Sequence, residues 1–407
     1  MSFLNALFLS GSGLLALGFT VQATAGGLWL NEYGDFSSGR ASAGAAAGVD
    51  DASTMLHNPA SMTRLKGSQL TVTAAALQPS LKFSRDSDPA MGPGGGNGGD
   101  AGVFSPTGGV FYVGDLNSDR WDIGIYFSGL AGSGLEYDDD WVARFQATES
   151  SLKIAALAPT LAYRLTDKLS VGASIQMIAS SLTTKLRVPA LLPNSNEGRA
   201  TLDGSDVGGG YTFGVLYELS DSTRIGINYQ SELESDFSGD LSLENINRTI
   251  ATNTELTMVQ KARLGVHHAV NDKLSLQFTL GWDDWSALDQ VFVSTQNVGG
   301  GLKKNARDTT HTALGFQYNL SAQWKMTGGV SYDTSPLSST FRTADLPLDR
   351  QVKVATGFEY TPDKNWKVSA YANYTDLGNG KIDAGSWSGE YDTDAIYQLG
   401  ISASWMY

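Results

Sequence analysis

Residues 397–407 read YQLGISASWMY, and along this stretch large apolar side chains alternate with small or polar ones. Successive side chains of a β-strand point to opposite faces, so the alternation predicts a strand with one apolar and one polar face. The large apolar members are Tyr397, Leu399, Ile401, Trp405 and Tyr407. An apolar face that carries aromatic residues is typical of a strand that faces lipid.

The same alternation recurs inside the chain. In residues 169–177 (LSVGASIQM) and 274–282 (LSLQFTLGW), every second side chain is apolar and the residues between them are small or polar. In a membrane barrel the apolar set faces lipid and the polar set faces the lumen. A soluble β-sandwich has its apolar face inside and has shorter strands, so it fits less well. The pattern therefore favours an all-β fold, a transmembrane β-barrel.

The composition agrees with this class. The chain has 407 residues, a net charge of −14 and no cysteine. The acidic balance argues against a nucleic-acid partner, which needs a basic face. A chain without cysteine can cross an oxidising periplasm without forming disulfides. After residue 25 no stretch is long and apolar enough for a transmembrane helix, so a helical inner-membrane protein is not expected.

Turn signals give the number of strands. The alternating runs are separated by short polar connections at 117–120, 166–168, 220–223, 271–273, 321–323 and 362–365. Longer segments rich in Gly, Ser, Asp, Asn or Pro lie near 85–102, 131–149, 188–199, 237–254, 297–307, 334–348 and 377–390. Together they predict a 14-stranded antiparallel up-and-down barrel with both ends in the periplasm, in which residues 273–295 form one long bulged strand.

The first 25 residues are typical of a signal peptide. Residues 3–21 are mostly apolar, and Ala23-Thr24-Ala25 has the small-x-small pattern of a cleavage site. The first ten residues contain no Lys or Arg, so the usual positive charge is missing. An amphipathic anchor helix is the alternative interpretation.

Residues 26–66 precede the first strand and lack its alternation, whereas residues 67–407 carry the barrel pattern. A barrel of intermediate size has a lumen too wide for side chains alone to fill, so it would leak unless it were plugged. The small side chains near Arg40 suit a confined lumen, and Arg40, Asp50 and Asn58 offer polar groups to a polar wall. We therefore predict an N-terminal plug, with a disordered periplasmic tail as the alternative.

Three stretches of the chain resemble one family, the FadL-type outer-membrane transporters of long-chain fatty acids and hydrocarbons. The stretches are residues 27–62, which contain the triplet Asn58-Pro59-Ala60 and resemble the family's N-terminal hatch, residues 225–240 (IGINYQSELESDFSGD) and residues 307–350. The resemblance implies a fourteen-stranded barrel with a hatch, uptake of hydrophobic molecules, and an inward kink in the third strand that opens a lateral exit into the bilayer.

A lateral exit makes physical sense, because release into water would lose roughly 0.8 kcal/mol of transfer free energy per methylene. In the third predicted strand, Gly124 or Gly129 is a candidate for the kink, since a glycine within a strand often marks a bulge. The alternative is that these glycines only relieve crowding on the lumen face.

Candidate ligand contacts lie on the eighth predicted strand, where Lys261 and Arg263 are expected to point into the lumen. A fatty-acid carboxylate in an apolar pocket needs such a cation, because an unpaired buried charge is very costly. The plug residues Arg40, Asn58, Pro59 and Ala60 complete this predicted ligand and plug set. The alternative for the two cations is a structural ion pair with an acidic residue of the plug, Asp50 or Asp51.

The sequence contains no convincing motif of a catalytic or metal site. Residues 94–99 (GGGNGG) match G-x-G-x-x-G, but they lie in a long loop without a following helix. The four histidines show no metal-ligand spacing. We therefore predict no catalytic residue, metal or cofactor, with an outer-membrane hydrolase as the alternative.

The sequence predicts a monomeric, passive transporter of hydrophobic small molecules in the outer membrane of a Gram-negative bacterium. Long-chain fatty acids are the first expectation and aromatic or alkane hydrocarbons the second. Gln230, where the family often has Arg, and Val259, where Pro is common, leave the substrate open. A structural or adhesive barrel is an alternative of another class. Lys185 and Arg187 are expected near the outer rim, where they would meet lipopolysaccharide phosphates.

Overall fold

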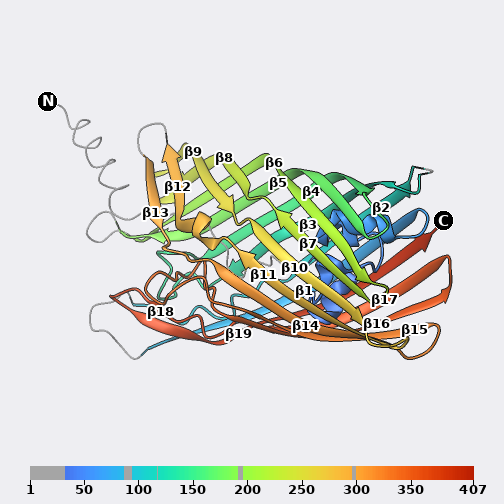
Figure 1. The fold of residues 1–407 in the computed structure, drawn as a ribbon. Helices are drawn as coiled ribbons and strands as arrows, with labels where there is room; N and C mark the ends of the chain where they lie inside the picture. The colour runs from blue at the N-terminus through green and yellow to red at the C-terminus, as the bar shows by residue number, and fades with distance from the viewer. Residues whose placement is uncertain (1–32, 87–93, 117, 191–195, 296–298) are drawn as a thin grey trace.

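The strands of the protein pair antiparallel in one sheet that closes on itself (Figure 1). The structure, a computed structural model, describes residues 33–86, 94–116, 118–190, 196–295 and 299–407. The first strand, β1 (Gln69–Arg85), pairs with β2 (Ser105–Asp115) on one side and with the last strand, β19 (Ser388–Met406), on the other. The sheet is thus a barrel. The predicted signal peptide, residues 1–25, lies outside the described residues.

Between these strands the sheet contains β3 (Trp121–Glu136), β4 (Glu149–Arg164), β5 (Leu169–Val188), β6 (Gly198–Ser220), β7 (Thr223–Gln230), β8 (Leu233–Leu243), β9 (Arg248–Met258), β10 (Lys261–Ala269), β11 (Leu274–Asp283), β12 (Gln290–Thr295), β13 (Gly299–Lys303), β14 (Thr309–Asn319), β15 (Trp324–Asp333), β16 (Gln351–Asp363), β17 (Trp366–Asp376) and β18 (Ile382–Asp383). The pairs β7–β8, β9–β10, β11–β12 and β13–β14 each continue across a short interruption, and β18 is a two-residue strand within a loop. The wall therefore has 14 strands, as the sequence predicts.

The short connections predicted from the sequence all join consecutive wall strands at one end of the barrel, which we call the short-turn end. The opposite end is the loop end. Residues 273–295, predicted as one bulged strand, form one wall strand that the 3-10 turn η5 (Trp285–Asp289) divides into β11 and β12. The even number of strands, which depends on this segment, is confirmed.

Two predicted long loops are wrong. Residues 237–254 mostly belong to the hairpin of β8 and β9, which turns at η4 (Glu244–Ile246), and residues 297–307 include β13. In β8 the pattern is the reverse of a lipid-facing strand, because Phe237 and Leu241 are buried whereas Ser238 and Asp240 are exposed. The polar outer face suggested a loop, but it belongs to strands that continue past the lipid-facing band.

Nearer the short-turn end, the wall follows the predicted alternation. In β5, Ile175 is 68% exposed and Met177 51%, whereas Ser174 and Gln176 are each 1% exposed. Other exposed apolar side chains of the outer face include Ile123, Ile125, Phe127, Leu157, Leu161, Leu276, Leu280, Leu399 and Ile401. This outer band is the surface that faces lipid.

Residues 33–66 lie inside the barrel at the short-turn end, as the dark-blue segment of Figure 1 shows. They contain the turns η1 (Phe36–Arg40), η2 (Ala45–Ala47) and η3 (Pro59–Arg64) and the short helix α2 (Thr54–His57). Among the described residues, no helix has the length and apolar character needed to cross a bilayer. We call residues 33–66 the plug.

The wall carries glycine where the backbone of the plug comes closest. A Cβ atom on Gly226 would overlap the carbonyl group of Ala46, and one on Gly214 would overlap the side chain of Asn58. The wall glycines Gly172, Gly265, Gly315, Gly329 and Gly357 contact other plug atoms in the same way. Any side chain at these positions would therefore push the plug away from the wall.

Polar contacts also hold the plug. Lys367 Nζ donates to the backbone oxygen of Asp50 at 2.6 Å, and Gln317 Nε2 donates to Asp50 Oδ1 at 3.0 Å. Within the plug, Arg40 Nη2 lies 2.6 Å from Asp50 Oδ2. Burial alone would raise the pKa of Asp50, but Arg40, Lys325 and Lys367 outweigh this effect and hold its pKa well below the usual range. Asp50 is therefore charged at neutral pH and ties the plug to two wall strands.

Replacing Gly226 by valine should open the barrel to small ions. Valine suits a β-strand, but its side chain needs the space that Ala46 occupies, so the plug must shift. We expect the conductance of the purified protein in planar bilayers to rise several-fold over the wild type.

The matched control is Gly209→Ala in β6, because a Cβ there would lie 3.6 Å from its nearest neighbour, an ordinary contact. Both variants should remain folded, judged by the faster migration of unboiled samples on gels. A folded Gly226→Val barrel with wild-type conductance would show that the plug does not seal the lumen.

Candidate functional site

The ladder between β2 and β3 is interrupted partway along the wall. The two strands pair from Asp115 and Asp122, at the short-turn end, to Gly109 and Ser128. Beyond that point β2 continues to pair with β1 only. Contact between the two segments resumes at the isolated bridge of Gly102 and Leu135. The wall between these two points lacks its regular hydrogen bonds.

A β-bulge in β3 accompanies the interruption. The register of β3 with β4 shifts between Gly129 and Ala131, so Leu130 is an extra residue, and it is buried in the lumen. Of the two glycines proposed for a kink, Gly129 adjoins the bulge. Gly124 instead lies in a regular ladder, and its inner face packs on Met55 and Met62 of the plug. Gly124 thus gives room to the plug and does not lie at the bulge, and Gly129 remains the candidate for the kink.

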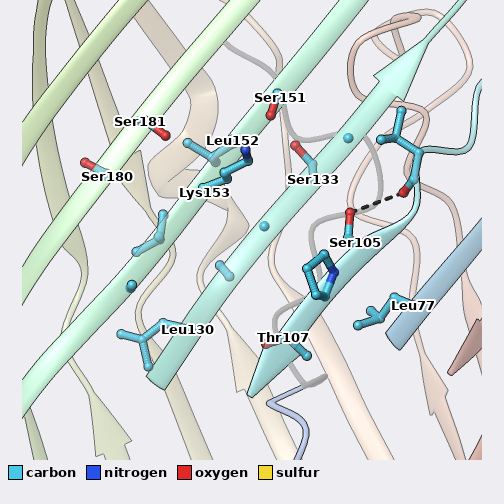
Figure 2. Close-up of a pocket in the computed structure, with 18 of the residues that line it drawn as sticks. Leu77, Ser105, Thr107, Leu130, Ser133, Ser151, Leu152, Lys153, Ser180 and Ser181 are labelled. Carbon is cyan, nitrogen blue, oxygen red and sulfur yellow. Dashed lines mark hydrogen bonds between the residues drawn. The ribbon is translucent and has the colours of Figure 1, made fainter. Parts of the chain in front are cut away.

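A cavity of about 620 Å³ occupies the interruption (Figure 2). Its lining includes lumen-facing Leu130 and Ile154, which are buried, and Phe104 and Phe127, which are exposed on the outside. Its lining comes from both faces of the wall, so the cavity lies between the lumen and the outer surface. We call it the lateral opening. Most of its lining is apolar, with hydroxyl groups such as that of Ser105 among the other contributors.

The lumen between the plug and the loop end is mostly apolar, with a few buried hydroxyl groups such as those of Ser180 and Thr184. The inward-facing side chains there form one contiguous cluster that includes Leu152, Ile154, Ile178, Leu182, Leu186, Leu202, Leu233, Phe237, Leu256 and Met258. Tyr33, Met55, Leu56 and Met62 of the plug belong to the same cluster, as do Leu337, Leu346 and Leu348 of a loop. The prediction of a polar lumen thus holds beside the plug and is wrong for the half of the barrel nearer the loop end.

The predicted cations Lys261 and Arg263 lie where the plug meets this apolar lumen. Lys261 Nζ donates a hydrogen bond to the hydroxyl of Tyr33 and lies 4.9 Å from the centre of its ring. Arg263 binds the carboxylate of Asp283 on the next strand with two hydrogen bonds, of 2.8 and 3.0 Å. Lys261 is buried and Arg263 is half-buried, and both have partners other than the predicted Asp50 and Asp51. Arg263 therefore forms a structural ion pair with Asp283 of the wall.

The plug residues Asn58, Pro59 and Ala60 serve as anchors in this structure. Asn58 Nδ2 donates to the carbonyl of Val215 in β6 at 3.0 Å and to that of Ala46 at 2.6 Å. Its Oδ1 caps η3 by accepting from Ala60 N at 3.0 Å, and Pro59 occupies the first position of that turn. None of the three lines the lateral opening. Arg40 likewise forms a buried ion pair with Asp50.

The cations predicted to meet lipopolysaccharide have acidic neighbours within the protein. Lys185 Nζ lies 2.5 Å from Glu149 Oε2, and Arg187 Nε lies 3.7 Å from Glu197 Oε2. Within the described part of the chain, no group of three or more His, Asp or Glu side chains is placed to hold a metal ion. What the site offers is thus an apolar passage through the wall.

Sequence reasoning missed the extra residue Leu130 and the apolar lining around Leu152 and Ile154. A signal for the bulge was available. Leu130 and Leu135 are apolar residues five positions apart, so a regular strand with a period of two cannot bury both, and in the structure both are buried.

Comparisons with known proteins agree with this architecture. The model of the family "Outer membrane protein transport protein (OMPP1/FadL/TodX)" matches residues 16–398. The long-chain fatty acid transport protein of Escherichia coli O6:H1 is 24% identical over 418 residues, 92% of each chain. Outer membrane protein P1 of Haemophilus influenzae is 25% identical over 408 residues, covering 88% of this chain and 87% of that protein.

Solved structures share the fold. The crystal structure of a Pseudomonas aeruginosa FadL homologue superposes with a TM-score of 0.84 at 19% identity, over 91% of this chain and 97% of that one. The Pseudomonas putida toluene transporter TodX superposes with a TM-score of 0.70 at 17% identity, over 93% and 99% of the two chains. Because the family model spans nearly the whole sequence, the chain belongs to the OMPP1/FadL/TodX family of outer membrane transport proteins, and its barrel lies in the outer membrane of a Gram-negative bacterium.

Proposed function

We propose that the protein takes up long-chain fatty acids at the loop end, holds them in the apolar lumen and releases them sideways through the lateral opening into the bilayer. The observation that carries this proposal is the continuity of the lining. Leu130, Leu152 and Ile154 belong both to the apolar cluster of the lumen and to the wall of the lateral opening. An apolar chain can therefore leave the lumen without entering water.

The free energy of transfer favours this route. Passing a chain of sixteen methylenes from an apolar lumen into water would cost on the order of 10 kcal/mol, whereas passing it into lipid costs little. The plug contacts the wall on the short-turn side of the opening, through Gly124 among other residues. We propose that it blocks the straight path to the periplasm and leaves the sideways path open.

Fatty acids are preferred over neutral hydrocarbons because relatives that match over nearly their full length are named long-chain fatty acid transport proteins. Monoaromatic hydrocarbons are the second candidate, since the toluene transporter TodX has the same fold, although at 17% identity that likeness concerns the fold alone. Like its family, the protein is a transporter. A purely structural barrel would not need a passage through its wall, so the lateral opening argues against that alternative.

Replacing Ile154 by aspartate should block uptake. Ile154 is buried at the junction of the lumen and the lateral opening, so the change puts an unpaired charge in the path of the chain. In cells that lack their own fatty-acid transporter, we expect uptake of labelled oleate to fall at least tenfold.

The conservative variant Ile154→Val keeps the lining apolar and should retain most of the uptake. Heat-modifiable migration on gels checks that both barrels fold. Wild-type rates of oleate uptake by a folded Ile154→Asp variant would contradict the pathway, and a wild-type barrel that takes up neither oleate nor toluene would contradict the proposed function.

A further inference from the structure

One cation lines the lateral opening. Of the residues around this cavity, all of which the structure describes, Lys153 is the one with a charged side chain. It lies on β4 directly opposite Gly132 of β3, on the outer face of the wall, and is exposed. Figure 2 shows Lys153 on β4, on the side of β3 away from Ser105 and Thr107 of β2.

Lys153 also differs from the other lysines on the outer face near the loop end. Lys185 is paired with Glu149 at 2.5 Å, and Lys82 lies 3.9 Å from Asp100. Within the described ranges, no hydrogen bond or ion pair to Lys153 is found. Its ammonium group is thus available to a ligand that passes Gly132.

The height of Lys153 in the membrane follows from the outer face of β4. On the short-turn side this face carries apolar residues from Tyr163 through Leu157 to Ala155, and on the loop side it carries Ser151 and Glu149. At about 3.3 Å per residue and a tilt of about 40°, the apolar stretch spans roughly 20 Å, close to the height of a lipid-facing band. Lys153 therefore lies at the upper border of the hydrocarbon, at the level of the headgroups.

A fatty acid that enters a bilayer places its chain in the hydrocarbon and its carboxylate at this same level. The carboxylate cannot cross the apolar lining unpaired without a large cost. Lysine has a long apolar stem, so its ammonium can reach the headgroup region while the stem covers the rim of the opening. A charge-assisted hydrogen bond to a carboxylate is stronger than one between neutral groups.

Building on the lateral release proposed above, we propose that Lys153 is a specificity residue of the exit. It binds the carboxylate of a leaving single-chain amphiphile while the chain slides through the lateral opening. The exit therefore passes ionised fatty acids faster than neutral molecules with the same chain.

The test compares oleate with oleyl alcohol, which has the same chain and no charge. Lys153→Gln keeps the length of the side chain and removes its charge. In cells that lack their own fatty-acid transporter, at mildly alkaline pH, we expect this variant to take up labelled oleate about fivefold more slowly and oleyl alcohol at the wild-type rate. Lys153→Arg should retain most of the oleate uptake.

Lys82→Gln is the matched control, because Lys82 is an exposed lysine of β1 that does not line the opening. It should change neither rate. Unchanged oleate uptake in Lys153→Gln would overturn the inference. If the uptake rates of oleate and oleyl alcohol fell equally, the inference would also be overturned. Lys153 would then affect how the barrel is positioned among lipid phosphate groups, not which molecule passes. A wild-type protein that takes up neither compound would overturn the proposed function itself.

Discussion

The lateral opening exists because the hydrogen-bond ladder between two strands of the wall is interrupted, although lipid surrounds this wall. Backbone groups within a bilayer have no water to bind, so a barrel wall is normally continuous and each unpaired group costs several kcal/mol. Here the ladder between β2 and β3 stops after Gly109 and Ser128, close to the bulge in which Leu130 is an extra residue of β3. The interruption lies next to the outer border of the lipid-facing band, where polar headgroups can satisfy part of the exposed backbone. This position keeps the cost of the opening low.

The two halves of the lumen differ in the polarity of their inner wall. Beside the short turns the inner wall combines polar residues and glycine with a few apolar side chains such as Leu216, and the plug is held there by close backbone contact and by the charges around Asp50. Nearer the loop end the inner wall is apolar, and the outer wall, as in β8, is polar. The proposed route turns sideways before it reaches the plug, so one barrel can close the lumen to water-soluble molecules and still offer an apolar path.

Much of the fold could be predicted from the sequence, since short turns and alternating faces mark each strand that contacts lipid. The hairpin of β8 and β9 was missed because its apolar side chains face inwards, so its exposed Ser238 and Asp240 suggested a loop. The sequence left two candidate positions for the bulge, Gly124 and Gly129. Both are glycines within the same strand, and only the register with β4 distinguishes them. Lys261 and Arg263 were placed correctly in the lumen, but their partners Tyr33 and Asp283 depend on how the plug and a neighbouring strand pack, which local patterns do not encode.

The central claim, that the solute leaves between β2 and β3, can be tested by a reversible lock across the opening. A Cβ atom on Gly129 would lie 2.9 Å from Thr107 Oγ1, so cysteines at these two positions are close enough for a disulfide, and the chain has no other cysteine. Labelled-oleate uptake should be measured on Thr107→Cys/Gly129→Cys before and after oxidation, with the cross-link verified by mass. We predict that oxidation abolishes uptake and that reduction restores it. Equal uptake by the cross-linked and the reduced protein would contradict the lateral route.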